Sequence, residues 1–278
     1  MGELVAERVR RYVLDGSDED LRRLLRISQV TSEAARAAFR RVGAREGWRA
    51  IDCGCGPIGA LAEMSDIVGP AGRAVGVDFS EAAIRRARSV IEALGLENVE
   101  VLVGDIYDIE PATLGDDFDM ALTRCFLMHQ PDPVRALSQV ATLIRPGGWI
   151  IAHEPLPAPP PRSFPQLDAL ARYWEVVHET MVLGGAAPRA VEDLPRSARA
   201  AGLEVVEMSG FFKMVAPQLG FDLHAATAAA VRERAVSLGI AAEKIDDLVQ
   251  ELRSATDDNY EWVSSPFYFD LALRKPAT

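Results

Sequence analysis

The stretch Asp52-Cys-Gly-Cys-Gly-Pro-Ile-Gly59 is the most informative segment of the chain. It ends a short apolar run at 49–53 and precedes a segment of helical character that continues to about Val68. Glycines between a strand and a helix permit a tight turn and let the backbone approach a ligand, while the helix N-terminus faces that ligand. The pattern predicts a strand, a glycine-rich turn and a helix, with a ligand bound at the turn.

Strands and helices continue to alternate after this turn. Further strands are predicted at 74–78, 99–103, 118–123 and 149–153, with a helix that Ser80 caps and Gly95 ends, and another from about 132 to 144. Residues 145–148 read as a turn. A helix at 193–201, a strand at 203–208 and a last strand near 267–274 complete the pattern. This spacing predicts an α/β fold, a doubly wound, mostly parallel seven-stranded sheet with helices on both faces.

Three segments do not belong to this pattern: about 1–45, 155–188 and 218–262. They are mostly amphipathic and helical, with separate helices expected near 17–28, 32–42 and 166–183. A proline-rich connector at 155–161 is stiff and extended. We interpret these segments as a helical cap over the ligand edge of the sheet. Residues 1–278 would then form a single domain, with a core of about 46–154, 189–217 and 263–275.

Composition narrows the possible partners. The formal net charge of −11 repels phosphate backbones and anionic lipid surfaces, so no nucleic acid and no membrane partner are expected. No apolar run reaches the roughly 18–20 residues of a membrane span, and the N-terminus lacks the apolar stretch of a signal peptide, so a cytoplasmic location is expected. The partner would be a small molecule, and a homo-oligomer is possible. No spacing of side chains predicts a metal site.

Two carboxylates stand at predicted strand ends beyond the glycine turn. Asp78 ends the second strand, where a carboxylate can accept hydrogen bonds from both hydroxyls of a ribose, and we expect it to face solvent. Gly104-Asp105 ends the third strand. The glycine turn and Asp78 alone fit either a dinucleotide or S-adenosylmethionine (SAM).

The motifs together distinguish between these ligands. Asp52 gives the turn the pattern D-x-G-x-G, and Leu143-Ile-Arg-Pro-Gly-Gly148 precedes the fifth strand. With Val77-Asp-Phe79 and Asp105, this set resembles the successive motifs of Rossmann-like, class I SAM-dependent methyltransferases over about residues 45–155. Phe126-Leu-Met-His-Gln-Pro-Asp-Pro133 resembles the segment after the fourth strand in members that act on small molecules.

The resemblance implies SAM as the cofactor and assigns its binding site. Asp78 would hold the ribose, Phe79 would cover the adenine and Asp105 would accept the adenine amino group. The implied cofactor-binding residues are Asp52, Gly54, Cys55, Gly56, Asp78, Phe79, Gly104, Asp105, Ile106, Arg124, Cys125 and His129. Metal-assisted catechol methyltransferases place an acidic ligand where this chain has Arg124, and its Thr123-Arg-Cys-Phe126 lacks the motif of DNA amino-methyltransferases.

Candidates for catalysis and acceptor binding come from the strand ends and the cap. His153 with Glu154 ends the predicted fifth strand, and His178 lies on the predicted cap helix, so these three are candidate catalytic residues. Four residues on the same cap helix are candidates for the acceptor wall: Tyr173, Trp174, Val177 and Met181. Tyr12 is a candidate contact on the cofactor side. A structural histidine and ordinary core packing are the competing interpretations.

The sequence therefore predicts an enzyme that transfers a methyl group from SAM, by in-line displacement, to a small, hydrophobic, natural-product-like metabolite. Two alternatives stay open. An NAD-dependent oxidoreductase would share the glycine turn and Asp78. A methyltransferase-like protein that binds SAM without methyl transfer would carry the same cofactor motifs.

Overall fold

The computed structural model describes residues 18–110, 114, 117–255 and 259–277, so the predictions on residues 1–17, Tyr12 among them, lie outside the described residues. Its main sheet has seven strands in the order β3-β2-β1-β4-β5-β10-β7. The strands are β1 Arg49–Cys53, β2 Arg73–Asp78, β3 Val99–Val103, β4 Phe118–Arg124, β5 Ile144–Pro155, β7 Glu204–Phe211 and β10 Tyr268–Arg274. All pairs from β3 to β5 are parallel, and β10 runs antiparallel to β5 and β7. The predicted doubly wound, mostly parallel sheet is confirmed.

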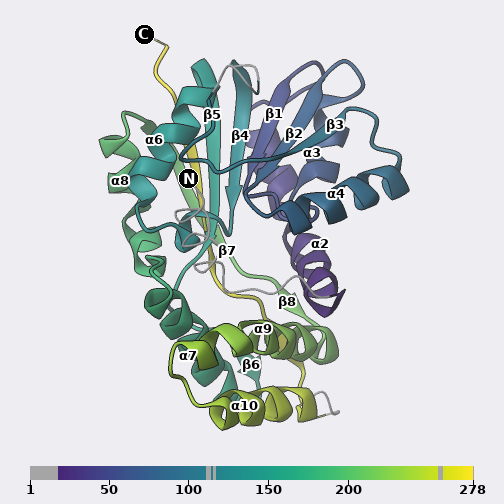
Figure 1. Ribbon diagram of the computed structural model, residues 1–278, viewed down its shortest axis with the longest axis vertical. Helices are drawn as coiled ribbons and strands as arrows, with labels where there is room; N and C mark the ends of the chain where they lie inside the picture. Colours follow the sequence, from purple (N-terminus) through teal and green to yellow (C-terminus); the bar gives the residue numbers. More distant parts are fainter. Residues whose placement is uncertain (1–17, 111–113, 115–116, 256–258, 278) are drawn as a thin grey trace.

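Helices cover both faces of this sheet (Figure 1). One face packs against α2 Asp18–Arg41 and α3 Leu61–Val68, next to which lies α4 Glu81–Leu94; the other packs against α6 Pro133–Leu143 and α8 Leu194–Ala200. Strand side chains point alternately to the two faces. On β4, Met120 and Leu122 join the cluster under α2 and α3, while Ala121 joins the opposite cluster. Because both faces are covered, the centre of β4, Met120–Leu122, is apolar on both sides.

Two details of the core differ from expectation. β5 begins at Ile144 and ends at Pro155, so it includes residues 145–148, which were predicted as a turn, and runs past the predicted end at 153. Gly147 has a φ of 75°, and the pairing of β4 with β5 is irregular between Phe118 and Met120, which accommodates the glycines within the strand.

Ser80 and Gly95 bound α4 as predicted: Ser80 Oγ accepts the Ala83 N–H, and Gly95 is left-handed.

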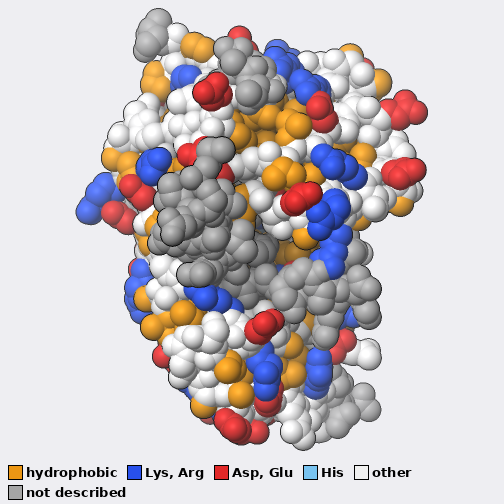
Figure 2. All heavy atoms as spheres, viewed as in Figure 1, with side chains coloured by type: hydrophobic (Ala, Val, Ile, Leu, Met, Phe, Trp, Pro, Cys, Tyr) orange, Lys and Arg blue, Asp and Glu red, His pale blue; other side chains and the backbone are white. Residues whose placement is uncertain are grey.

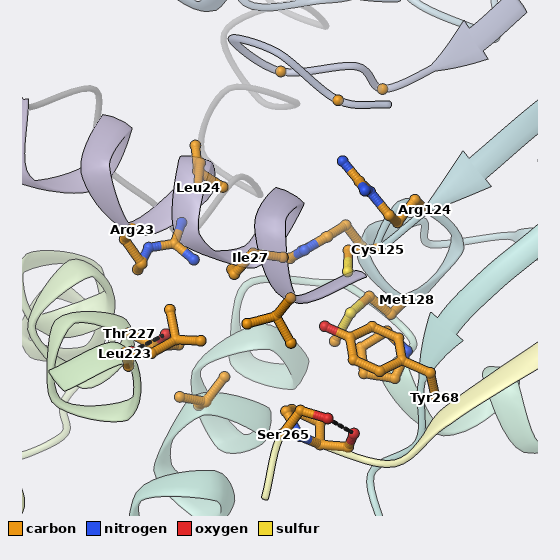
Figure 3. A pocket seen from close by; sticks show the side chains of 18 of the residues that line it. Arg23, Leu24, Ile27, Arg124, Cys125, Met128, Leu223, Thr227, Ser265 and Tyr268 are labelled. Atoms are coloured by element: carbon orange, nitrogen blue, oxygen red, sulfur yellow. Dashed lines mark hydrogen bonds between the residues drawn. The ribbon is translucent and has the colours of Figure 1, made fainter. Parts of the chain in front are cut away.

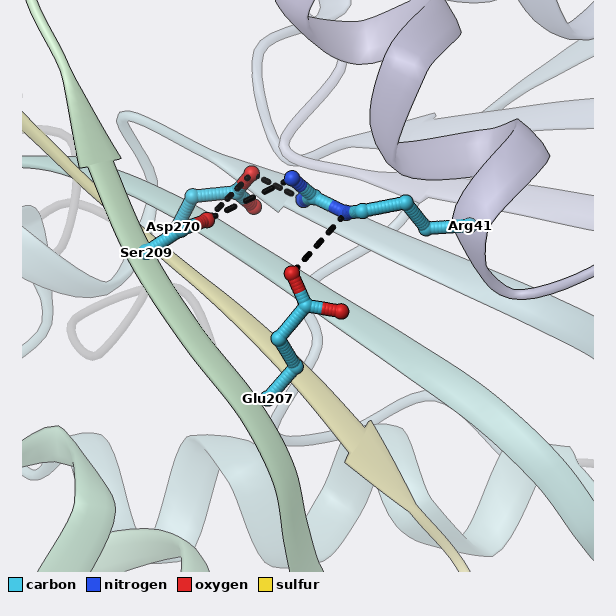
Figure 4. A network of polar contacts seen from close by, with 4 residues as sticks. All are labelled: Arg41, Glu207, Ser209 and Asp270. Atoms are coloured by element: carbon cyan, nitrogen blue, oxygen red, sulfur yellow. Dashed lines mark hydrogen bonds and ion pairs between the residues drawn. The ribbon is translucent and has the colours of Figure 1, made fainter.

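The α2 helix is continuous through the point where two separate helices were predicted. Thr31 Oγ1 donates back to the Ile27 carbonyl at 2.8 Å, so the polar residues at this point stay within the helix. The C-terminal half of α2 packs on the sheet face rather than over its ligand edge, with Phe39 fully buried. Figure 4 shows Arg41, near its end, in contact with Asp270 of β10 and Glu207 of β7.

A cap lies beyond the C-terminal ends of the parallel strands (Figure 1). Its helices are α7 Ala169–Leu183, α9 Pro217–Ser237 and α10 Ala242–Ser254. The cap also contains a small antiparallel sheet. The order of its strands is β6 Ser163–Phe164, β9 Trp262–Ser264 and β8 Met214–Val215. Strands of two or three residues carry no readable periodicity, which is why the sequence did not predict this sheet. Short 3₁₀ turns, η1 Leu127–His129 and η2 Pro188–Asp193, complete the described elements.

On the face seen in Figure 2, basic, acidic and hydrophobic side chains of the described residues all reach the surface. Within the described ranges, none of the helices combines the length and the apolar character that crossing a membrane requires.

Candidate active site

The glycine-rich turn between β1 and α3 is held tightly against its neighbours. Gly54 has a φ of +76°, and its N–H donates to the Val77 carbonyl at 2.7 Å. A Cβ on Gly54 would lie 2.4 Å from Cδ2 of Phe126, so a side chain here would collide with that ring. A Cβ on Gly56 would meet nothing within 4 Å, which means that this part of the turn faces open space.

Asp52 fixes the shape of the same turn. Its Oδ2 accepts the Ala60 N–H at 2.7 Å, and the side chain is 1 % exposed. A Cβ on Gly59 would lie 2.1 Å from that oxygen, so glycine is required for the contact. Burial raises the pKa of Asp52 to about 6, against the opposing effect of the Arg124 guanidinium. Asp52 therefore both closes the turn and faces the site.

One cavity, here called the strand-end cavity, lies at the C-terminal ends of β2 and β3 and spans about 770 Å³, its open mouth included. Asp78 lines it but is 6 % exposed, so the expectation that it faces solvent was wrong. Its carboxylate accepts the Gly56 N–H at 2.9 Å and the Ser80 N–H at 2.8 Å, and burial raises its pKa. Asp105 accepts the Tyr107 N–H at 2.9 Å. The walls of the strand-end cavity also include Phe79, Gly104, Ile106, Phe126, Gln130 and Pro131.

The second cavity, here called the cap cavity, lies between the glycine turn and the cap and encloses about 1100 Å³, its mouth included. Figure 3 shows Leu24 and Ile27 of α2, Leu223 of α9, Met128, and Tyr268 of β10 around it. The predicted acceptor wall on α7 lines it too: Tyr173, Trp174, Val177 and Met181. Gly54, Cys125 and His129 line both cavities, so the two adjoin. All of the predicted cofactor residues line one cavity or the other.

Two arginines contribute positive charge to the mostly apolar cap cavity. Arg124 Nη1 donates to Thr31 Oγ1 of α2 at 2.8 Å, which ties the end of β4 to that helix. Arg23, on the same helix, pairs with Asp20 at 2.6 Å. Both arginines line the cavity, and neither is more than 9 % exposed.

A buried tyrosine and histidine face this cavity as a pair. Tyr173 Oη lies 2.5 Å from His224 Nδ1, and His224 Nε2 lies 2.9 Å from the Ser264 carbonyl oxygen. Burial lowers the pKa of His224 to about 4 and raises that of Tyr173 well above its ordinary value. The sequence did not single out His224, because its partner is 51 residues away and no motif connects the two.

The predicted catalytic residues do not line either cavity among the described residues. His153 and Glu154 lie away from the cavities because β5 continues to Pro155, which places both residues inside the strand. Pro155 lines the cap cavity instead. The Glu154 carboxylate accepts the N–H groups of residues 126–128 at 2.9–3.3 Å, and burial raises its pKa to about 8. It therefore positions the turn after β4.

His153 and His178, the two histidines predicted to be catalytic, pack against aromatic side chains in this structure. The His153 ring contacts the rings of Phe211 and Tyr268, with centroids 4.8 and 5.1 Å away, and burial lowers its pKa to about 3. His178 Nδ1 donates to the Trp174 carbonyl at 2.8 Å. No group of His, Cys, Asp or Glu in the described part of the chain could hold a metal ion.

Comparison with known proteins gives the family. A family model described as a methyltransferase domain matches residues 44–200, more than half of the chain. The chain belongs to this methyltransferase family. The resemblance to class I SAM-dependent methyltransferases is thereby confirmed, and the family argues against the NAD-dependent alternative.

Individual relatives of this methyltransferase support the same assignment. An uncharacterized protein in a transposon of Streptomyces fradiae is 33 % identical over 66 % of this chain and 53 % of its own length. Nocamycin O-methyltransferase from Saccharothrix syringae is 32 % identical over 47 % of this chain and 46 % of its own. The chain thus spans about half the length of the curated relatives it matches.

A solved structure shows the same fold. A SAM-dependent methyltransferase from Thiobacillus denitrificans, in complex with S-adenosylhomocysteine, is 20 % identical, with a TM-score of 0.52 over 87 % of this chain and 90 % of that one. The seven-stranded sheet of this chain therefore lies in a fold that it shares with that structure.

Proposed function

We propose that this methyltransferase binds SAM across the two cavities and transfers its methyl group to a small molecule in the cap cavity. The observation that carries the proposal is the junction of the cavities at Gly54, Cys125 and His129. One side of the junction offers carboxylates at strand ends, and the other is apolar and covered by the cap. A ligand that spans the junction would present its central atoms to the cap cavity.

The strand-end cavity fits the adenosine part of SAM. The Asp78 carboxylate accepts two backbone N–H groups and retains lone pairs for ribose hydroxyls. Asp105, two residues beyond the end of the neighbouring strand β3, can accept the adenine amino group. Phe79 and Ile106 line the same cavity and offer apolar surface to a planar ring. Gly56 leaves open space where the methionine part would pass.

The chain contributes positioning and exclusion of water. SAM supplies an activated methyl group, because its sulfonium is an excellent leaving group. Holding the acceptor in line with the methyl carbon removes up to about 7–11 kcal/mol of the barrier in the best cases. The apolar side chains of α2, α7 and α9 that line the cap cavity would keep water from the reacting atoms.

The acceptor class follows from the walls of the cap cavity. They are mostly apolar, with aromatic side chains from α7 and β10, and they suit a mid-sized hydrophobic metabolite of the natural-product type. The relative named nocamycin O-methyltransferase favours an oxygen acceptor.

Titration calorimetry with SAM, S-adenosylhomocysteine and NAD tests the cofactor. We expect SAM to bind in the micromolar range or better and NAD not measurably. Binding of NAD with no binding of SAM would contradict the proposal. A metabolite panel assayed for S-adenosylhomocysteine release tests the transfer, and a protein that binds SAM but methylates nothing in the panel would favour the non-transferring alternative.

A further inference from the structure

The Tyr173 and His224 pair forms a chain of hydrogen bonds from the cap cavity to the backbone. Tyr173 is 1 % exposed on α7, and His224 is 2 % exposed on α9. Both line the cap cavity, and the chain ends on the carbonyl of Ser264 in β9. Three separate elements of the cap therefore meet at this one pair.

The direction of each hydrogen bond follows from the Ser264 carbonyl, at which the chain of hydrogen bonds ends. A carbonyl oxygen only accepts, so His224 Nε2 must carry the proton that is donated to Ser264. The neutral imidazole then has its lone pair on Nδ1, which accepts the Tyr173 hydroxyl proton at 2.5 Å. The pair is set so that Tyr173 can pass its proton to His224 and accept another at its own oxygen.

We propose that Tyr173 is a catalytic residue that accepts the proton of an acidic acceptor hydroxyl, a phenol or an enol, and that His224 is the positioning residue that receives the proton of Tyr173. This inference rests on the function proposed above. The acceptor O–H donates to Tyr173 Oη as the hydroxyl proton of Tyr173 moves to His224 Nδ1. An acceptor lone pair forms the new oxygen–carbon bond, and the electrons of the broken carbon–sulfur bond remain on sulfur.

The charges in the cavity support this route. Before transfer, one positive charge resides on the sulfonium; afterwards, one resides on the His224 imidazolium, so the total charge in the closed cavity is unchanged. The imidazolium has both N–H groups satisfied, one by Tyr173 Oη and the other by the Ser264 carbonyl. It can release the extra proton to water when product leaves.

The same surroundings restrict the acceptor. Burial lowers the pKa of His224 to about 4, which makes it a weak base. An aliphatic alcohol is too weak an acid for such a base, whereas a phenol or enol gives up its proton more readily. Burial raises the pKa of Tyr173 well above its ordinary value, and the positive charge of Arg23, on α2, opposes that shift. Arg124 lines the same cavity and adds to this field.

The test uses the full chain with Tyr173→Phe, which keeps the aromatic ring, and His224→Gln, which replaces the basic imidazole by a neutral amide that still forms hydrogen bonds. Tyr260→Phe is the matched control, because Tyr260 packs on Phe221 within the cap and does not line either cavity among the described residues. The acceptors are ring-substituted phenols, cyclic enols, and aliphatic alcohols and amines of similar size. Release of S-adenosylhomocysteine gives kcat and KM, and calorimetry gives SAM affinity.

We expect the wild type to methylate phenols or enols and not the alcohols. Both variants should lose about 10²–10⁴-fold in kcat toward weakly acidic phenols, the contribution typical of a general base. Acceptor KM and SAM affinity should change less than threefold. Nitrophenols that are already ionised at the assay pH need no base, so the variants should methylate them at nearly the wild-type rate.

A second readout does not depend on turnover. Long-range ¹H–¹⁵N spectra of the imidazoles should show His224 protonated at Nε2 in the wild type, with a shifted Nδ1 signal in Tyr173→Phe. The proposal is overturned by equal losses toward ionised and un-ionised phenols, by unchanged kcat, by the opposite tautomer, or by turnover of amines or alcohols only. It is also overturned if SAM binds and no phenol or enol reacts. Absence of SAM binding would instead refute the proposed function.

Discussion

Replacing Asp78 by alanine should destabilise the protein even when no ligand is present. In the structure, its carboxylate accepts the N–H of Gly56 at 2.9 Å and that of Ser80 at 2.8 Å. A hydrogen bond to a charged group contributes about 1.5–3 kcal/mol, so the two together set an upper range of about 3–6 kcal/mol. Water that enters the space left by the carboxylate recovers part of this, and removing the buried charge removes the burial cost that raises the pKa of Asp78. We expect the free energy of unfolding to fall by about 3 kcal/mol.

The same change should weaken SAM binding by two routes. The ribose loses the acceptor for its hydroxyls, and the glycine turn loses the contact that holds Gly56 in place. Affinity should fall at least tenfold, which corresponds to about 1.4 kcal/mol. Asp78→Asn retains one carbonyl oxygen as an acceptor and should lie between the wild type and Asp78→Ala in both measurements.

Urea denaturation of the ligand-free chain, followed by circular dichroism, measures the first effect, and calorimetry with SAM measures the second. Glu81→Ala is the control, because Glu81 lies in the first turn of α4 and contacts only Arg85 at 3.1 Å on the surface. If Asp78→Ala unfolds within about 0.5 kcal/mol of the wild type, a range typical of surface substitutions, the two hydrogen bonds do not hold the turn and the reasoning fails.

Three further changes test other parts of the site. Gly54→Ala should lose stability and SAM binding together in melting and calorimetric measurements, because its Cβ would lie 2.4 Å from the Phe126 ring and its φ is +76°; normal binding would show that the ring moves freely. Burial raises the pKa of Glu154 to about 8, above its unfolded value, so its contribution to stability is complete at acid pH and is lost as pH rises from about 5 through 8. Buried His129, His153 and His224, whose pKa values are lowered by burial, act in the opposite direction but equally in both proteins. The stability of the wild type relative to Glu154→Gln should therefore fall over that window in urea titrations; parallel curves would contradict this. Trp174→Ala should raise acceptor KM several-fold with SAM affinity unchanged, whereas His178→Ala, whose ring does not line the cavity, should leave KM nearly unchanged; the reverse order would place the acceptor elsewhere.

The cofactor site was predictable because its residues occupy fixed positions relative to strand ends. Asp52, Asp78 and Asp105 each end or follow a parallel strand, and such ends meet at one edge of a sheet. The prediction of His153 and Glu154 as catalytic residues depended on one strand boundary. Since β5 extends to Pro155, the two residues before it, which were taken for the strand end, lie within the sheet.

The cap was harder to predict, because its contacts join distant parts of the chain. The pairing of Tyr173 with His224 depends on how α7 packs on α9, and no local sequence pattern predicts that packing. Likewise, separate helices were predicted near 17–28 and 32–42, yet Ser28 and Thr31 donate hydrogen bonds to the carbonyls of Gly59 and Ile27 beside and within one long helix. The four residues predicted on α7 all line the cap cavity, because they share one face of a single helix.

The order of elements along the chain has a consequence for how this protein can diversify. The α7 helix is inserted between β5 and α8, and α9 and α10 are inserted between β8 and β9. Each inserted segment begins and ends beyond the strand ends. Its length can therefore change without disturbing any strand pairing in the seven-stranded sheet. Duplicated copies of such a gene could therefore acquire new acceptors by altering two inserted segments, while the strands and glycine turn that shape the strand-end cavity are inherited unchanged.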